Sequence, residues 1–193
     1  MTLQRCAWAN PANPLYLAYH DHEWGIPCHD ELTLFEMLNL EGAQAGLSWE
    51  MILNKRENYR QAFDGWDAHK VAAYDEAKVA SLLANPGIVR NRLKINAAIG
   101  NARAYLRLVD EVGGLEPYLW HRVGHQPLQN SGRERIITSP LSDEISKDLK
   151  KRGFKFVGST IIYAYLQSMG IVNDHDHACF CRAAQQERAL KNS

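Results

Sequence analysis

The stretch Glu31–Trp49, ELTLFEMLNLEGAQAGLSW, is the part of the sequence around which we expect the fold to be organised. A helix over 31–43 places three apolar residues and one acid on a single face, at i, i+3, i+4 and i+7: Leu34, Met37, Leu38 and Glu41. A buried carboxylate is costly unless a partner meets it. With Trp49 close behind, Glu41 indicates a pocket for a flat, partly cationic group. The simpler alternative is that Glu41 lies at the edge of this face and reaches solvent.

The composition is that of an ordinary globular protein, and the length suits a single domain over residues 1–193. Hydrophobic residues make up 46% and charged residues 23%, and the formal net charge is zero, so any surface for nucleic acid must be a local patch. The N-terminal segment lacks the apolar core of a signal peptide, and no apolar run is long enough to span a membrane. We expect a cytoplasmic protein that does not bind membranes.

Helical periodicity runs through most of the chain, whereas the alternation typical of strands is almost absent. Caps and helix breakers divide the sequence into about nine or ten expected helices. Most of them cover residues 14–22, 31–43, 48–63, 68–73, 75–84, 90–109, 115–122, 142–152 and 159–169. Ser48 and Asp67 are expected N-caps, and the polar segment 124–141 is expected to be a loop. The sequence therefore predicts a compact all-α fold.

Residues 142–169 are expected to form two helices joined by a tight connector that contains Val157, Gly158 and Ser159. A glycine lets the backbone approach a partner closely, and the free N–H groups at a helix start can hold a phosphate. Basic residues lie around this connector: Lys147, Lys150, Lys151, Arg152 and Lys155. The pattern suits contacts with the DNA backbone. On pattern alone, an ordinary helical hairpin with a basic, solvated end is the simpler interpretation.

Cysteine and histidine residues gather toward the two ends of the sequence. Two pairs in the last part have the spacing that lets a helix bind one ion: His175 with Cys179, and His177 with Cys181. Cys6 and His20 could complete a Cys2His2 site, which would be closed and therefore structural. The spacing does not choose between the two pairs, nor does it exclude Cys28 or His29. The alternative is free thiols and surface histidines.

Five large aromatic residues occur within the first fifty positions, around Glu41: Trp8, Tyr16, Tyr19, Trp24 and Trp49. Rings with polar atoms are most often part of a core. They could also line a slot for a flat, electron-poor ring, because aromatic faces attract cations and a carboxylate would accept hydrogen bonds from such a ring.

Taken together, these residues resemble the DNA-3-methyladenine glycosylase I family along nearly the whole chain. The similarity is dense in CAW at 6–8, PLYLAYHDHEWGIP at 14–27 and LFEMLNLEGAQAGLSW at 34–49. It continues through KRENYR at 55–60, IVRNRLKINAAIGNARAYL at 88–106 and LKKRGFKFVGSTIIYAYLQSMGIVNDH at 149–175. The resemblance implies a monomeric helix-hairpin-helix DNA-repair enzyme. Such an enzyme cleaves the N-glycosidic bond of N3-methyladenine in alkylated double-stranded DNA, without a lyase step.

The resemblance also implies roles for individual residues. The family's ligands for one structural zinc ion match Cys6, His20, His175 and Cys179. Its base-recognising acid, the candidate catalytic residue, matches Glu41. Its pocket aromatics match Trp8, Tyr16, Tyr19, Trp24 and Trp49. Its DNA-gripping hairpin matches residues 155–160, which include Lys155, Gly158, Ser159 and Thr160. The 124–141 segment matches the family weakly, so no function is carried onto it.

The implied reaction begins when the target base is flipped out of the duplex into the pocket. Methylation at N3 makes the adenine cationic and a good leaving group, and water then captures an oxocarbenium-like sugar. Many enzymes with this hairpin place an aspartate after it. Asp174 lies near that place, and we expect it to support the metal region instead. Two alternatives are a zinc-stabilised DNA-binding module without activity, which does not need Glu41, and a zinc hydrolase in which water replaces one ligand.

Overall fold

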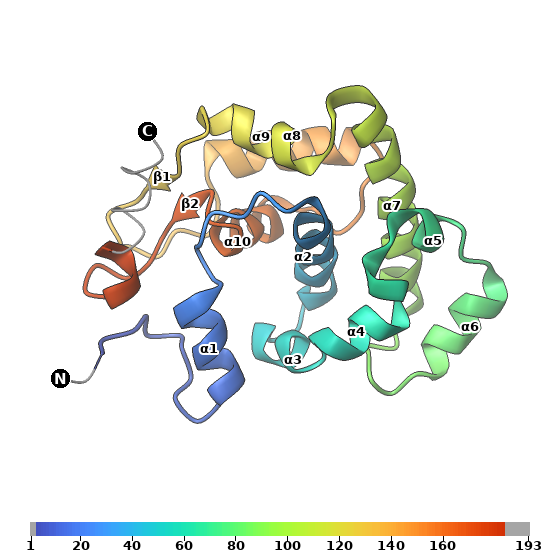
Figure 1. Cartoon of the computed structure of the whole chain (residues 1–193), viewed down its shortest axis with the longest axis horizontal. Helices are drawn as coiled ribbons and strands as arrows, with labels where there is room; N and C mark the ends of the chain where they lie inside the picture. Colours follow the sequence, from blue (N-terminus) through green and yellow to red (C-terminus); the bar gives the residue numbers. More distant parts are fainter. Residues whose placement is uncertain (1–2, 184–193) are drawn as a thin grey trace.

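In the computed structural model, which describes residues 3–183, helix α2 (Glu31–Gln44) lies in the middle of the molecule (Figure 1). The side chain of Asp30 caps its first turn by accepting a hydrogen bond from the backbone N–H of Thr33. All residues from 34 to 43 are buried, so α2 is covered on every side and not on one face alone. Glu41 is only 4% exposed, which excludes the alternative that it reaches solvent at the edge of an apolar face.

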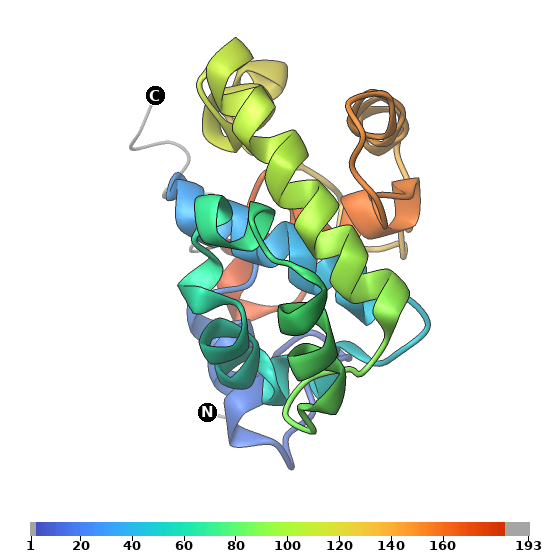
Figure 2. The ribbon, with the colours of Figure 1, turned by 90° about the vertical axis from the view of Figure 1, so that its right-hand side faces the viewer.

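The other helices surround α2, as Figure 1 shows. They are α1 (Pro14–His22), α3 (Trp49–Asn54), α4 (Arg56–Ala62), α5 (Ala68–Ala72), α6 (Glu76–Ala84), α7 (Arg92–Val112), α8 (Leu115–Trp120), α9 (Pro140–Lys151) and α10 (Ser159–Ser168), with 3-10 turns at Asp64–Trp66 and His121–Val123. Helix α10 packs beside α2, and α9 packs on α10. Figure 2 shows the long helix α7 running diagonally across the molecule, in contact with α2. The prediction of a mostly helical fold is confirmed.

Two helix boundaries differ from the prediction for local reasons. Ser48 caps α3 as expected, but the helix predicted over 48–63 is divided at Lys55, which ends α3 and begins α4. Helix α9 begins two residues earlier than predicted. Its first turn is held by a capping box in which Ser139 and Ser142 each accept a hydrogen bond from the other's backbone N–H.

The segment predicted to be a loop, 124–141, contains a short strand. Strand β1 (Leu128–Gln129) pairs in parallel with β2 (Val172–Asn173), which follows α10. The pairing fixes this segment beside the C-terminal part of the described chain, on the left of Figure 1. There the backbone N–H of Phe180 also donates to the carbonyl of Gln4, so the first and last described segments lie side by side. None of the described helices combines the length and apolar character needed to cross a membrane.

The connector 152–158 between α9 and α10 packs against α2 and α7. Phe156 has a φ of +54°, which is unusual for a residue with a side chain. A Cβ added to Gly42 of α2 would lie 3.1 Å from the Cβ of Phe156, so glycine permits the close approach. Asn101 of α7 accepts from the N–H of Lys155 at 2.8 Å and donates to its carbonyl at 3.2 Å. These contacts hold the connector in one place relative to α2.

Candidate active site

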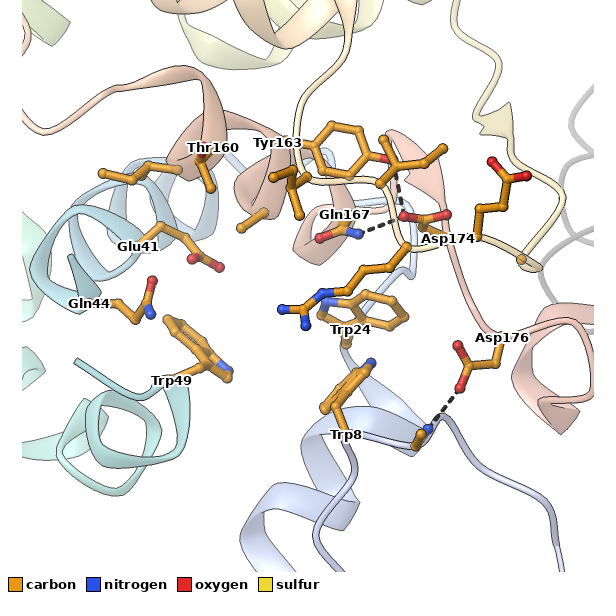
Figure 3. A pocket seen from close by; sticks show the side chains of 18 of the residues that line it. Trp8, Trp24, Glu41, Gln44, Trp49, Thr160, Tyr163, Gln167, Asp174 and Asp176 are labelled. Carbon is orange, nitrogen blue, oxygen red and sulfur yellow. Dashed lines mark hydrogen bonds between the residues drawn. The ribbon is translucent and has the colours of Figure 1, made fainter. Parts of the chain in front are cut away.

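A cavity of about 780 Å³ opens beside the C-terminal half of α2 (Figure 3). It is lined by all six residues that the sequence assigns to the pocket: Trp8, Tyr16, Tyr19, Trp24, Glu41 and Trp49. Side chains of α10 and of residues 132–137 complete the lining. The volume lies within the range of pockets that enclose small ligands. The structure thus brings together residues that are up to 41 positions apart in about the first quarter of the sequence.

The aromatic rings form two groups that face each other across the cavity. Trp8 packs edge-on against Trp24 with ring centroids 4.9 Å apart, and it also contacts Tyr16 at 5.3 Å. On the other side, Tyr19 and Trp49 lie 5.5 Å apart. Figure 3 shows Trp49 and Glu41 on one side of the cavity and Trp8 and Trp24 on the other. A flat ring held between such groups would contact aromatic surface.

Glu41 directs its carboxyl group toward the cavity, as Figure 3 shows. Burial raises the pKa of Glu41 to about 8, and hydrogen bonding with Ser168 offsets this only in part. The carboxyl group is therefore largely protonated at neutral pH while no cation is near. A cationic ligand would favour the carboxylate and lower this pKa.

Two further polar atoms in the cavity wall are buried and have no hydrogen-bond partner among the described residues. They are the hydroxyl of Tyr19 and the indole Nε1 of Trp49. Buried polar groups in proteins nearly always have a hydrogen-bond partner. Two such atoms without a partner at one cavity therefore indicate a binding place for a polar ligand. Together with Glu41 they offer a donor, a hydroxyl that can donate or accept, and an acid.

A cluster of four buried side chains lies behind one wall of the cavity: Cys6, His20, His175 and Cys179. Their ligand atoms all lie within 4.8 Å of one another. The Sγ of Cys179 lies 3.5 Å from both His20 Nε2 and His175 Nδ1, and the Sγ of Cys6 lies 3.4 Å from His175 Nδ1. This arrangement selects the pair His175 and Cys179, which the spacing alone left open.

The other residues that the sequence spacing did not exclude are not part of this set of four. His177 is exposed, and His29 forms an ion pair with Glu116. Cys181 forms a second, overlapping group with His20 and Asp21. The structure therefore provides one buried Cys2His2 set that could bind a metal ion.

The cluster and the cavity share a wall. The ring of Trp24 lies edge-on to that of His175 with centroids 4.5 Å apart, and Trp8 meets His20 at 5.1 Å. Asp21 accepts a hydrogen bond across 2.8 Å from the Nδ1 of His20. A carboxylate on the outer nitrogen of a histidine orients the ring for metal binding.

Asp174 does not support the cluster, so that expectation was wrong. Its carboxylate accepts hydrogen bonds from Gln167 Nε2 at 2.7 Å and Tyr163 Oη at 3.0 Å, and it lines the cavity (Figure 3). Asp176 takes the expected place, because its carboxylate accepts from the N–H of Ala7 at 2.7 Å, next to Cys6. The chain leaves β2 before Asp174, and the directions of the following side chains depend on tertiary contacts.

Sequence reasoning also missed several polar residues of the cavity wall, among them Gln44, Tyr163 and Gln167. Tyr163 and Gln167 are four apart on α10 and so share one face of that helix. Their polar atoms within an otherwise apolar helix were the available signal. Gln44 closes α2, and its amide donates to the carbonyl of Leu47 at 2.6 Å, which shapes the turn before Trp49.

The predicted DNA-binding residues lie at the connector and the start of α10. Gly158 is the N-cap of α10 and provides no side-chain cap, so the first N–H groups of the helix remain available. The hydroxyl of Ser159 donates to Asp143 Oδ1 at 2.5 Å, which commits it to α9. Lys155 and Thr160 are exposed, and Thr160 also lines the cavity. The start of α10 therefore lies at the edge of the cavity.

Comparison with known proteins gives the class of the molecule, since its sequence is similar to those of DNA-repair glycosylases. Residues 8–182 match the methyladenine glycosylase family. The chain therefore belongs to the methyladenine glycosylase family, in agreement with the resemblance found in its sequence motifs.

Several relatives match over nearly their full length. DNA-3-methyladenine glycosylase 1 of Escherichia coli (strain K12) is 51% identical over 182 residues, covering 93% of this chain and 97% of that protein. DNA-3-methyladenine glycosylase of Haemophilus influenzae is 41% identical, covering 93% and 98%. A crystal structure of 3-methyladenine DNA glycosylase I superposes with a TM-score of 0.89 at 49% identity, covering 92% of this chain and 99% of that one. The Staphylococcus aureus enzyme, whose structure concerns 3-methyladenine recognition, gives 0.89 at 34% identity, covering 94% and 98%.

Proposed function

We propose that this protein is a DNA-3-methyladenine glycosylase, which hydrolyses the N-glycosidic bond of N3-methyladenine in alkylated double-stranded DNA. It releases the free base for base-excision repair and acts as a cytoplasmic monomer. The observation that carries this proposal is the buried Glu41, which faces an aromatic cavity together with two unpaired polar atoms. The family of the chain supports the same reaction.

The cavity suits a flipped, positively charged adenine. The two groups of rings would contact the faces of the base, and aromatic faces attract a cation. Glu41 would accept N–H groups of the base as a carboxylate, since the charge of the base lowers the pKa that burial raises. An unmodified adenine carries no charge, so Glu41 would stay protonated beside it and the two would form no ion pair. Selection for the damaged base would then follow from charge as well as shape.

Cleavage of this N-glycosidic bond needs little from the protein beyond binding and orienting the nucleotide. The cationic adenine leaves as a neutral base, and water adds to the oxocarbenium-like sugar that remains. A lyase step would need an amine nucleophile, and no lysine is among the described residues that line the cavity. We therefore assign a monofunctional hydrolase.

The connector and the start of α10 would hold the DNA backbone as a helix-hairpin-helix motif. The free N–H groups after Gly158 can bind a phosphate, and the exposed ammonium group of Lys155 adds positive charge nearby. Ser159 would contribute its backbone, because its hydroxyl already bonds Asp143. Thr160 lies at the edge of the cavity, so a backbone held there passes the cavity mouth.

The Cys2His2 cluster would hold one structural zinc ion. Zinc bound at about 2.3 Å from sulfur and 2.0 Å from nitrogen in a tetrahedron places S and N roughly 3.5 Å apart. The distances of 3.4 and 3.5 Å between the cluster's Sγ and ring nitrogen atoms match this value. Four protein ligands leave no open position for a water, which disfavours the zinc hydrolase alternative. Bound zinc would supply rigidity to the wall formed by Trp8 and Trp24.

The test is to incubate the protein with duplex DNA treated with a methylating agent and to measure free 3-methyladenine by chromatography. We expect release by the wild type and a loss of about a hundredfold or more in Glu41→Gln. Glu57→Gln is the matched control, since Glu57 is 68% exposed and does not line the cavity. A wild type that binds the duplex but releases no base would instead support a DNA-binding module and overturn the proposal.

A further inference from the structure

The segment Ser131–Ile137, SGRERII, forms part of the cavity wall although it matches the family weakly in sequence. Gly132 and the five residues after it line the cavity. The segment is held at both ends: the N–H of His177 donates to the carbonyl of Gly132 at 2.8 Å, and Ser139 caps α9 directly afterwards. A Cβ on Gly132 would collide with the carbonyl of His175, so the segment packs tightly on the loop of the metal cluster. Its position at the cavity is therefore fixed by the fold.

Arg133 and Arg135 in this segment are exposed and have no partner. Their guanidinium groups form no hydrogen bond or ion pair among residues 3–183, and within that range only Arg90 shares this property. The other described arginines all bind a carboxylate or a carbonyl. Two of the three unpaired guanidinium groups thus belong to residues two positions apart that line one cavity.

The charge of these arginines decides which ligand they suit. Two guanidinium groups would repel the cationic base for which Glu41 is placed, so they do not suit base recognition. Guanidinium groups pair well with phosphate oxygens, often through two parallel hydrogen bonds. When a base enters the cavity, the phosphates on either side of its sugar remain at the mouth. Glu134 also lines the cavity and would repel a phosphate, so the segment carries a net excess of one positive charge.

We infer that Arg133 and Arg135 bind the phosphates that flank the flipped nucleotide. This inference rests on the proposed function and adds a second contact surface to the one at the start of α10. The two surfaces lie close together. Asn130, just before the segment, donates a hydrogen bond to Tyr163 Oη of α10 at 2.8 Å, which holds the segment beside that helix. The backbone on both sides of the damaged nucleotide is then held while the base is in the cavity.

The test uses a duplex with a central tetrahydrofuran abasic site, which mimics the product and cannot be cleaved. In Arg133→Gln/Arg135→Gln we expect affinity about tenfold weaker at 100 mM salt, and a slope of log affinity against log salt that is shallower by about two. Binding of free 3-methyladenine, followed by tryptophan fluorescence, stays unchanged. The KM for methylated DNA rises while kcat changes little.

Arg92→Gln/Arg103→Gln is the matched control, because it removes the same charge from the end of the molecule drawn on the right of Figure 1. Arg92 pairs with Glu76 of α6, and Arg103 donates to the carbonyl of Ala72 of α5 at 2.9 Å. We expect this control to keep the wild-type slope. An unchanged slope in the 133/135 variant, an equal change in the control, or a loss of free-base binding would each overturn the inference. A wild type that releases no 3-methyladenine and does not bind this duplex would instead contradict the proposed function.

Discussion

The indole of Trp24 lies edge-on to the imidazole of His175, with ring centroids 4.5 Å apart. One ring belongs to the cavity wall and the other to the Cys2His2 cluster, so the cavity and the cluster are packed directly on each other. A change in the cluster can therefore reach the cavity through direct ring contacts, this one and that of Trp8 with His20.

Cys6→Ser should release the zinc that we propose for the cluster and loosen the cavity wall. Structural zinc contributes several kcal/mol to folding, so we expect a Tm lower by about 10 °C or more. Metal content is measured by mass spectrometry and unfolding by heat. Cys28→Ser is the control, because Cys28 is half-buried and lies outside the cluster. Equal zinc content in Cys6→Ser and the wild type would contradict the assignment.

Glu41 should make the stability of the ligand-free protein depend on pH. Its pKa is raised from 4.5 to about 8, so between these values the unfolded chain has lost a proton that the folded protein keeps. The free energy of unfolding then falls as pH rises through this window, with a slope of up to about 1.4 kcal/mol per pH unit. Glu41→Gln lacks the group, so its stability relative to wild type should rise from pH 5 and level off above pH 8. Urea unfolding at several pH values measures this, and a constant difference would show that Glu41 titrates normally.

Tyr19→Phe should cost little stability, because the hydroxyl that it removes is buried without a partner in the described structure. Affinity for free 3-methyladenine should fall, since Tyr19 lines the cavity and its hydroxyl is free to bond a ligand. Tyr165→Phe is the contrasting variant. Its hydroxyl is equally buried but donates to the carbonyl of Leu34 at 3.0 Å, so its loss should cost about 1–2 kcal/mol. Similar stability losses in both variants would mean that Tyr19 has a structural partner.

Gly42→Ala should disturb the connector that we propose grips DNA. The new methyl group would lie 3.1 Å from the Cβ of Phe156, and overpacking of this kind costs about 1–3 kcal/mol. Affinity for duplex DNA should fall as well. Gly100→Ala provides the comparison, because a Cβ there meets nothing within 4 Å and should stabilise α7 by roughly 0.5–1 kcal/mol. Urea unfolding and DNA binding are measured for both, and a Gly42→Ala protein as stable as Gly100→Ala would contradict the packing argument.

Features with local causes were predictable from the sequence. Ser48 and Asp67 cap the helices for which they were chosen, because a capping side chain acts on backbone groups two or three residues away. Glu41 was found because an acid interrupted an apolar face. The five aromatic residues were noticed as a group around Glu41, and the family motifs assigned them to the pocket. Periodicity could not show that they meet at one cavity.

Features that depend on distant contacts were not predictable. The two residues of β1 carry no alternation, and their pairing with β2 depends on how α9 and α10 bring the chain back. The two carboxylates of Asp174 and Asp176 bond different parts of the fold, Gln167 of α10 and the N–H of Ala7, and the sequence does not show which acid meets which partner. Periodicity also described α2 as one-sided, since it does not report how many neighbours cover a helix.

The cluster takes its four side chains from opposite ends of the described chain, at positions 6, 20, 175 and 179. The ribosome synthesises Cys6 and His20 first. The four side chains can come together only after almost all of the described chain has been synthesised. Trp24 likewise lacks its contact with His175 until then. The helices around α2 can associate earlier, but the cluster that packs against the cavity wall cannot form until Cys179 has left the exit tunnel.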